Sequence, residues 1–176
     1  ADPTTGCVLV YDDPNSGCGD GIIQISAGSA HTLALQSNGT VYWWGVKTYA
    51  EPPEGVLFQQ ISGGKSHSCG IDMDNEVHCW GIKDEGNWDL GQVTLTPTEG
   101  KYSYVSAGYV HTCAIKEDGK AHCWGAGSED TLTDSQKPYE KGQVTLTPTD
   151  ALFKEIGAGH GHSCGLKVDG SVQCWG

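Results

Sequence analysis

Cysteine and histidine recur along this 176-residue chain at fixed, short spacings. Three cysteine pairs are each separated by ten residues, and a histidine stands two residues before the first cysteine of each pair. The pairs are Cys69 with Cys79, Cys113 with Cys123 and Cys164 with Cys174, preceded by His67, His111 and His162. Thiolates and imidazoles bind zinc, an activated thiol is a nucleophile, and two neighbouring thiols can form a disulfide. The residue types therefore allow three different chemistries.

Comparison of the three pairs favours disulfides over a metal site. Cys69 and Cys79, with His67 and His78, have the composition of a Cys₂His₂ zinc centre. The position of His78 is, however, a tyrosine, a histidine and a glutamine in the corresponding stretches, so a fourth ligand is not maintained. A matching histidine, His31, even begins a stretch without thiols. We expect disulfides, with buried reduced thiols as the second alternative, and no metal.

The repeated histidine is expected to be structural, with its ring bonded to backbone in a tight turn. Nucleophilic catalysis needs an activated serine or cysteine beside a base. Strand alternation turns Thr112 away from His111, and Cys113 is already assigned to a bridge. The sequence also lacks a glycine-rich phosphate loop and a zinc-protease helix motif. We therefore predict no catalytic residue and no cofactor.

These residues belong to a stretch that occurs four times. The copies are residues 31–45, 67–81, 111–125 and 162–176, each running from a histidine to Trp-Gly. An apolar residue and a run such as Ser106-Ala107-Gly108 precede each copy. The repeat cores are therefore residues 22–45, 59–81, 103–125 and 154–176. Self-similarity at this spacing is typical of a solenoid or a propeller.

Each copy is predicted to fold as a β-hairpin. Apolar residues alternate on both sides of a three-residue loop, whose third position is Gly39, Asn75, Gly119 or Gly170. Such loops need a left-handed residue at this position, which glycine and asparagine tolerate best. Counting outward from the loop pairs Cys113 with Cys123. The first copy has Leu33 and Trp43 at these two positions, so an apolar pair replaces the disulfide.

Charge and cysteine content restrict the function classes. Eight cysteines indicate an oxidising compartment, and a net charge of −12 argues against nucleic acid and anionic membranes. No stretch approaches the ~20 apolar residues of a membrane helix, so no direct membrane insertion is expected. The sequence shows no signal peptide, so a secreted protein is expected here in a mature or excised form. We predict an extracellular or secreted protein, or the ectodomain of a cell-surface protein.

Residues 1–21 are expected to form a separate leader. Cys7 and Cys18 are predicted to pair across a strand and a turn, although their spacing differs from that of the repeat. Residues 22–176 form the predicted repeat domain. Asn38 lies in an Asn-Gly-Thr sequon at a hairpin tip and is a candidate for N-glycosylation.

The segments between the copies vary in length and are the candidate binding loops. Two inserts each lead into an identical Gly-Gln-Val-Thr-Leu-Thr-Pro-Thr segment, at residues 91–98 and 142–149, which its β-branched alternation predicts to be a further strand. Variable loops on a constant scaffold commonly carry binding function. The candidate contact residues are Tyr49, Glu85, Asn87, Trp88, Asp89, Glu129 and Asp130.

The pattern Ser-Ala-Gly-x-x-His-Thr-Cys-Ala-Ile-x-x-Asp-Gly-x-x-x-Cys-Trp-Gly, at residues 106–125, resembles the RCC1 (regulator of chromosome condensation 1) repeat in its cysteine-bearing, secreted form. The resemblance covers most of residues 22–176 and implies an all-β propeller of four-stranded blades, often seven in number. Four copies are too few for such a ring. An arc of a larger propeller, a smaller ring and a ring completed by association are the three alternatives. Nucleotide exchange and chromatin binding by the nuclear namesake are not carried over.

The function predicted from the sequence is an extracellular protein-binding module that uses variable loops on a disulfide-stapled propeller and has no enzyme activity. The alternative is a carbohydrate-binding, lectin-like propeller, in which exposed rings stack on sugars. The rings considered for that role are Trp43, Trp88, Tyr49 and Tyr109, whereas Trp44, Trp80, Trp124 and Trp175 are expected to pack in the core.

Overall fold

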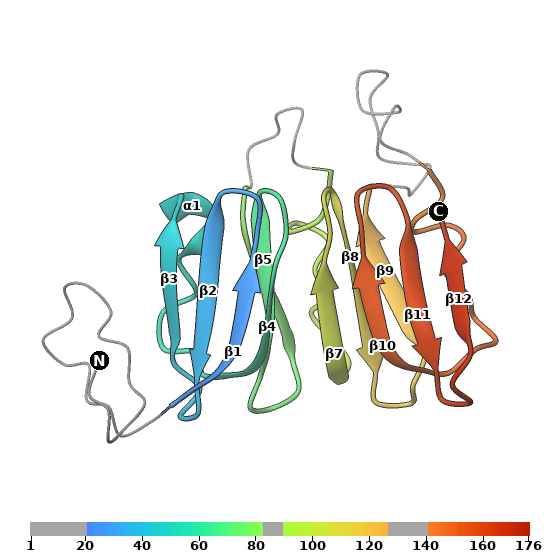
Figure 1. The fold of residues 1–176 in the computed structure, drawn as a ribbon, viewed down its shortest axis with the longest axis horizontal. Helices are drawn as coiled ribbons and strands as arrows, with labels where there is room; N and C mark the ends of the chain where they lie inside the picture. The colour runs from blue at the N-terminus through green and yellow to red at the C-terminus, as the bar shows by residue number, and fades with distance from the viewer. Residues whose placement is uncertain (1–20, 83–89, 127–140) are drawn as a thin grey trace, which may run out of the picture.

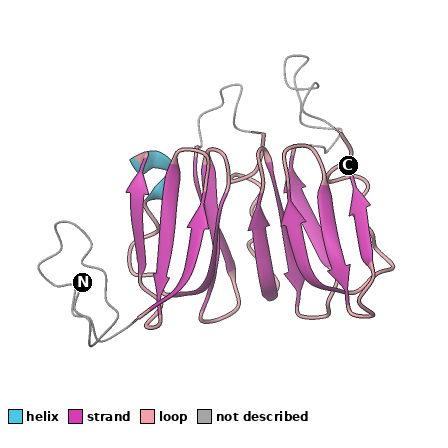
Figure 2. Cartoon of the chain, viewed as in Figure 1, coloured by secondary structure: helices cyan, strands magenta, loops and turns pink. Residues whose placement is uncertain are grey.

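The computed structural model describes residues 21–82, 90–126 and 141–176, whose regular structure is almost entirely β (Figures 1 and 2). Four three-stranded antiparallel sheets follow one another along the chain and stand side by side in the same order (Figure 1). We call these sheets blades 1 to 4. Among the residues described, no helix has the length and apolar character needed to cross a membrane.

Strand order within every blade follows the sequence. Blade 1 contains β1 (Ile22–Ala27), β2 (His31–Gln36) and β3 (Val41–Gly45), and blade 2 contains β4 (Phe58–Gly63), β5 (His67–Asp72) and β6 (Val77–Gly81). Blade 3 contains β7 (Tyr102–Ala107), β8 (His111–Lys116) and β9 (Ala121–Gly125), and blade 4 contains β10 (Phe153–Ala158), β11 (Ser163–Lys167) and β12 (Val172–Trp175). A single helical turn, α1 (Lys47–Ala50), follows blade 1. The resemblance implies four strands per blade, whereas the described residues form three.

The predicted hairpin register is confirmed. Cys113 lies opposite Cys123, and Leu33 lies opposite Trp43. The third loop position has a left-handed backbone in all four hairpins, with φ of 90° at Gly39, 64° at Asn75, 85° at Gly119 and 89° at Gly170. Glycine and asparagine are the residues that adopt this conformation at least cost, so the loop sequence sets the register.

Three of the predicted disulfides are present, and no free cysteine remains in the described ranges. They join Cys69 to Cys79, Cys113 to Cys123 and Cys164 to Cys174, with Cα–Cα distances of 4.0–4.1 Å. This separation belongs to the closer, non-hydrogen-bonded type of cross-strand pair. Each bridge staples one hairpin and does not link blades. Cys7 and Cys18 lie outside the described residues.

The prediction of a strand in the two Val-Thr-Leu-Thr segments is wrong. Both form a helical turn, in which the amide of Leu95 donates to the carbonyl of Gly91 at 3.0 Å and that of Leu146 to Gly142 at 2.9 Å. Each turn begins at its glycine, where the backbone is left-handed, with φ of 89° at Gly91 and 82° at Gly142. Backbone groups are bonded within the segment and not in a ladder with a neighbouring strand, so the β propensity of valine and threonine does not decide its structure.

The hydrophobic core lies between blades. Leu33 and Leu35 of β2 pack with Phe58 and Ile61 of β4, and Trp80 of β6 joins this cluster. Equivalent clusters lie between blades 2 and 3 and between blades 3 and 4. A three-stranded sheet has too little apolar contact of its own, so each blade is stabilised by its neighbours.

In blades 2, 3 and 4, the tryptophan near the end of the third strand bonds to the connection that precedes the blade. The indole N–H groups donate to backbone carbonyls, Trp80 to Ala50 at 3.2 Å, Trp124 to Gln92 at 3.1 Å and Trp175 to Gln143 at 3.1 Å. These three side chains are buried, as expected from the sequence, whereas Trp44 is exposed.

Side chains on the first strands add hydrogen bonds across the same interfaces. The amide of Gln24 accepts from the backbone N–H of Ile61 and donates to its carbonyl, both at 2.9 Å. Gln60 makes the same pair of bonds to Val105 at 2.8 and 2.9 Å. A serine hydroxyl accepts a backbone N–H at all three interfaces, Ser26 from Gly63, Ser62 from Ala107 and Ser106 from Ala158. Backbone groups of one blade are therefore satisfied by side chains of the blade before it.

Removing one hairpin disulfide is expected to lower stability measurably. The double change Cys113→Ala and Cys123→Ala should reduce the free energy of unfolding by about 2–3 kcal/mol, by the loop-entropy estimate for a loop of this length. Chemical denaturation under oxidising conditions measures the difference. A matched pair, Cys113→Leu with Cys123→Trp, reproduces the apolar pair of blade 1 and should recover part of the loss. Unchanged stability in the alanine pair would contradict a stabilising role for the bridge.

Candidate interaction surface

A Gly-x-x-His turn joins the first and second strands of each blade, at the end of the sheets drawn uppermost in Figure 1. In every turn the glycine N–H donates to the histidine carbonyl, from Gly28 to His31, Gly64 to His67, Gly108 to His111 and Gly159 to His162, at 2.8–2.9 Å. The backbone of the turn is therefore closed by the same hydrogen bond in all four blades.

Successive turns touch one another through their glycines. The backbone N–H of Ser29 donates to the carbonyl of Gly64 at 3.1 Å, Lys65 to Gly108 at 3.1 Å and Tyr109 to Gly159 at 3.0 Å. A Cβ atom added at Gly28 would lie 2.5 Å from the carbonyl oxygen of Gly64 and 2.3 Å from the His31 ring. Only glycine permits this approach, so the small residue before the turn allows the blades to stack closely.

The turn histidine bonds a hydroxyl group of the next blade, not the backbone, so the predicted bonding partner is wrong. The Nε2 atoms lie 2.7–2.9 Å from the hydroxyl oxygens, His31 from Ser68, His67 from Thr112 and His111 from Ser163. The Ser68 hydroxyl donates to the carbonyl of Tyr49 at 2.6 Å, so His31 Nε2 carries the proton that is donated to Ser68. The histidine is therefore an inter-blade residue.

Burial keeps these histidines neutral. The pKa of His67 is lowered to about 3, chiefly by desolvation and further by His111 and His31. Desolvation, with added repulsion from His162 and His160, lowers the pKa of His111 to about 4. At neutral pH both rings are uncharged, which suits a buried hydrogen bond better than a general base.

The first central residue of each turn forms a continuous row, which we call the turn row and define as Ser29, Lys65, Tyr109 and His160. The ammonium group of Lys65 donates to the Tyr109 hydroxyl at 2.6 Å and lies 4.0 Å from the centre of that ring. The rings of Tyr109 and His160 have centroids 3.9 Å apart. A shallow hollow of about 230 Å³ runs between the turns beside the row.

The described residues that flank the two long inserts lie beside the turn row. The N–H groups of Ile82 and Ala126, which follow the Trp-Gly of blades 2 and 3, donate to turn carbonyls at 3.0 and 2.9 Å. Leu90, where the first insert ends, is buried with Ala126 and Val110, and Tyr109 packs against this cluster. The turn row and the insert anchors therefore belong to the same end of the molecule.

Of the predicted contact residues, only Tyr49 falls within the described ranges. It lies in α1, half-buried, with its ring edge-on to His31 at a centroid distance of 6.2 Å. This placement at the interface of blades 1 and 2 gives it a packing role. The other candidates, Glu85, Asn87, Trp88, Asp89, Glu129 and Asp130, lie outside the described residues. Asn38 occupies an exposed hairpin tip at the opposite end, and its glycosylation stays a prediction.

Sequence reasoning did not identify the turn row, although the repeat contained a signal for it. The glycine and histidine of the turn are the same in all copies, whereas the residue after the glycine is a serine, a lysine, a tyrosine and a histidine. Both residues between the constant glycine and histidine differ in every copy, and variable loop positions on a constant scaffold commonly carry function. What the sequence could not show is that the blade stacking brings these residues into contact.

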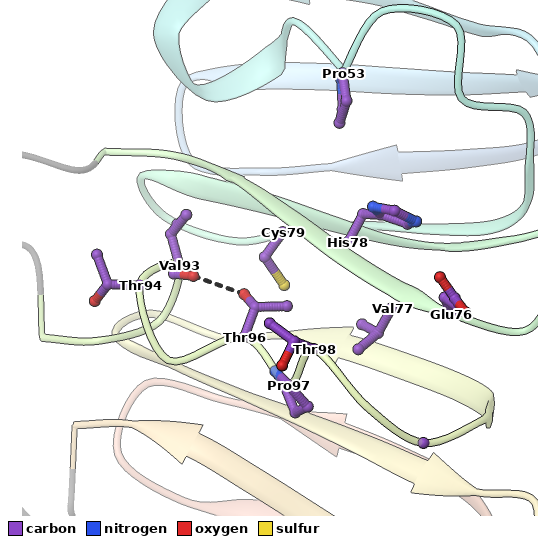
Figure 3. A pocket seen from close by; sticks show the side chains of 11 residues that line it. Pro53, Glu76, Val77, His78, Cys79, Val93, Thr94, Thr96, Pro97 and Thr98 are labelled. Atoms are coloured by element: carbon purple, nitrogen blue, oxygen red, sulfur yellow. Dashed lines mark hydrogen bonds between the residues drawn. The ribbon is translucent and has the colours of Figure 1, made fainter.

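A larger cleft of about 560 Å³ lies between β6 and the segment before blade 3 (Figure 3). Glu76 and His78 line it, opposite threonine side chains such as Thr96, whose hydroxyl donates to the carbonyl of Val93 at 2.7 Å. With Asp72, these two side chains have the composition of a cation site. His78 is, however, bonded to Asp72 at 2.7 Å, and Glu76 is paired with Lys101 at 2.9 Å. These pairings account for the cluster without a metal.

Acidification is expected to destabilise the fold through the buried histidines. An unfolded histidine gains a proton below pH ~6.5, whereas His67 and His111 resist protonation down to pH values near 3 and 4. The unfolded chain therefore binds more protons as the pH falls, and each histidine costs up to about 1.4 kcal/mol of stability per pH unit below 6.5. Chemical denaturation at pH 6.5 and at pH 5 should show this loss in the free energy of unfolding of the unchanged chain. The His67→Gln variant should lose less between the same two pH values. Equal losses in both proteins would contradict the assignment.

Known structures contain the same arrangement. The chain is similar to the CRINKLY WD40 ectodomain of the Arabidopsis thaliana receptor kinase ACR4, at 30% identity over 88% of this chain and 49% of that chain, with a TM-score of 0.66. The ectodomain of the Physcomitrella patens receptor kinase CR4 matches at 27% identity over 88% of this chain and 39% of that chain, also with a TM-score of 0.66. Human WBSCR16 matches at 17% identity over 88% of this chain and 47% of that chain, with a TM-score of 0.65. At this identity the match shows a shared fold alone. This chain thus spans about half or less of these structures.

A search of curated proteins finds no significant match. The family model of the regulator of chromosome condensation (RCC1) repeat, in contrast, matches residues 22–48, 58–87, 103–130 and 153–176. Each match contains one of the four blades, and together they span more than half of the chain. The likeness to two receptor ectodomains and the four repeat matches agree with the observed blades, and the chain therefore belongs to the RCC1 repeat family and has an RCC1-like propeller fold.

Proposed function

We propose that this chain is an extracellular protein-binding module, which uses the turn row and the adjoining inserts to contact a protein partner and carries out no catalysis. The proposal is carried by one observation. The turn row places four chemically different side chains at one repeat position of the scaffold, and three of them, Lys65, Tyr109 and His160, contact one another in sequence.

The composition of the turn row suits protein recognition. Tyrosine offers a large rigid surface with a polar tip, and such residues are enriched among those that dominate binding energy. Lys65 and His160 flank Tyr109 and hold its ring in place through the contacts described above. A pre-organised aromatic residue loses little side-chain entropy on binding. The insert residues Trp88, Asp89 and Glu129 are proposed to extend the same surface.

Two observations support an extracellular location. Disulfides persist in oxidising compartments, and three of them staple the hairpins. Two similar structures are ectodomains of receptor kinases. The hydroxyl–imidazole pairs of the described turns support binding over catalysis, because Ser68, Thr112 and Ser163 are fully buried between blades, where a substrate cannot reach them.

The carbohydrate-binding alternative has less support. Sugar stacking requires an accessible aromatic face, whereas Tyr49 packs against His31 and Tyr109 has Lys65 over its ring. The cleft of Figure 3 is lined by threonine, proline, valine and polar residues, including His78, and by no tryptophan, tyrosine or phenylalanine. A protein partner is therefore the better fit.

The test is binding to a panel of purified extracellular domains, with a triple variant of the turn row. Lys65→Ser, Tyr109→Ser and His160→Ser give every blade the residue that blade 1 already has at this position, Ser29, so the fold should be kept. Loss of the tyrosine anchor should weaken binding at least tenfold, equivalent to about 1.4 kcal/mol. Surface plasmon resonance measures the affinities.

A matched control changes the opposite end of the molecule in the same way. The first residue of the hairpin loop is Ser37 in blade 1 and Met73, Glu117 and Val168 in the others. The triple variant Met73→Ser, Glu117→Ser and Val168→Ser should bind within about twofold of the unchanged chain, as expected for sites outside an interface. Equal affinity of the turn-row variant and the unchanged chain would contradict the proposal.

A further inference from the structure

The disulfides of blades 2 and 3 differ in their access to solvent. Each of these blades has a described blade on both sides, so the two bridges can be compared directly (Figure 1). In blade 3, Cys113 is 0% exposed and Cys123 is 6% exposed. In blade 2, Cys69 is also 0% exposed, whereas Cys79 is only partly buried. A molecule in solution can therefore reach one sulfur of the blade 2 bridge, while the blade 3 bridge is shielded.

The accessible sulfur faces the cleft of Figure 3. Cys79 lines this cleft, and its sulfur points from β6 toward Thr96 on the other side (Figure 3). The volume of about 560 Å³ is within the range of sites that hold small molecules. Gly100 lines the cleft two residues after the segment 91–98, whereas Ala151, two residues after the identical segment 142–149, packs in the apolar cluster that contains the blade 3 bridge. The connection before blade 4 thus contributes apolar cover that the connection before blade 3 does not.

The buried sulfur of the blade 2 bridge has a hydrogen-bond donor. The Thr112 hydroxyl oxygen lies 3.7 Å from Cys69 Sγ and 2.9 Å from His67 Nε2. A disulfide sulfur has no proton, so the hydroxyl donates to the sulfur and accepts the Nε2 proton of the neutral histidine. Thr112 is fully buried, so water does not compete for this bond. In blade 3, the Ser163 hydroxyl lies 3.4 Å from Cys113 Sγ in the same way. The donor is therefore common to both bridges, and access distinguishes them.

We propose that Cys79 is a thiol-exchange site, at which a small peptide thiol enters the cleft and becomes covalently attached. The thiolate of the incoming molecule attacks Cys79 Sγ, a new S–S bond forms between them, and the bond between Cys79 and Cys69 breaks. The electron pair of the broken bond stays on Cys69, which leaves as a thiolate, and the proton of the incoming thiol goes to water. The step needs no oxidant, because one disulfide replaces another.

The Thr112 hydroxyl stabilises the sulfur that leaves. Negative charge develops on Cys69 among apolar side chains, where a thiolate without a partner would be costly. Hydrogen bonds to ionised groups are stronger than those between neutral groups, so the bond from Thr112 strengthens as Cys69 leaves. Exposed disulfides are the ones that exchange readily, and a better leaving thiol speeds the exchange. The two sulfurs therefore have different roles, in which Cys79 is attacked and Cys69 leaves.

The test uses the full oxidised chain, with reduced glutathione as the probe. Samples are quenched with acid, which protonates thiolates and stops exchange, and peptide mapping by mass spectrometry locates glutathione on each cysteine. We expect glutathione on Cys79 and a free thiol at Cys69. This reaction should be faster than that at Cys113 and Cys123 by about tenfold or more, because a buried bridge reacts only when its blade opens. Glutathione mainly on Cys69, equal rates at the two bridges, or no adduct in blade 2 would overturn the proposal.

A matched pair of variants tests the role of the hydroxyl. Thr112→Val keeps the shape of the side chain, and exchange at Cys79 should slow roughly tenfold, as for the loss of a hydrogen bond to a charged group. Ser163→Ala removes the equivalent donor at the next interface and should leave the rate at Cys79 within about twofold. Near-UV circular dichroism checks that both variants are folded. Equal rates in the two folded variants would overturn the role of Thr112. The position of glutathione in the unchanged chain decides the proposal even where Thr112→Val does not fold.

Discussion

The burial of one blade against the next is the constraint on which this structure depends. A three-stranded sheet of about sixteen residues has two faces, and neither can be covered from within the same blade. The apolar clusters therefore form between blades, and the polar groups are satisfied across the same boundaries by glutamine, serine and histidine side chains. Each disulfide links the two strands of one hairpin, and the cysteines of blades 2 and 3 also pack in the apolar clusters between blades.

The Gly-x-x-His turn connects the scaffold to the surface that we propose for binding. Its glycine lets the neighbouring backbone approach, and its histidine bonds to the next blade. The two residues between them are thus held in fixed positions by inter-blade contacts on both sides. The free energy that stacks the blades therefore also orders Lys65, Tyr109 and His160, so the proposed surface needs little rearrangement to bind a partner.

The same interface explains both the acid sensitivity expected of the fold and the exposure of Ile25 and Trp44 in blade 1. A histidine between blades is desolvated, so it stays neutral and opposes acidification. Among the described residues no blade precedes blade 1, and its Ile25 and Trp44 are exposed, whereas the equivalent Ile61 and Trp80 of blade 2 are buried. Repeat proteins depend on nearest-neighbour contacts, and terminal repeats without a covering element are the least stabilised.

The sequence by itself determined the hairpins, their register, three disulfides and the repeat family, because local turn residues and alternation encode them within about fifteen residues. Only the tertiary structure decided the partner of each turn histidine and the contacts of the turn row, since these join residues about 37 to 52 positions apart in different blades. The prediction of a strand in the Val-Thr-Leu-Thr segments was wrong for the same reason. Their buried glutamines and the tryptophans that bond to them lie in different parts of the chain, and that context favoured a turn over the strand that local propensity predicted.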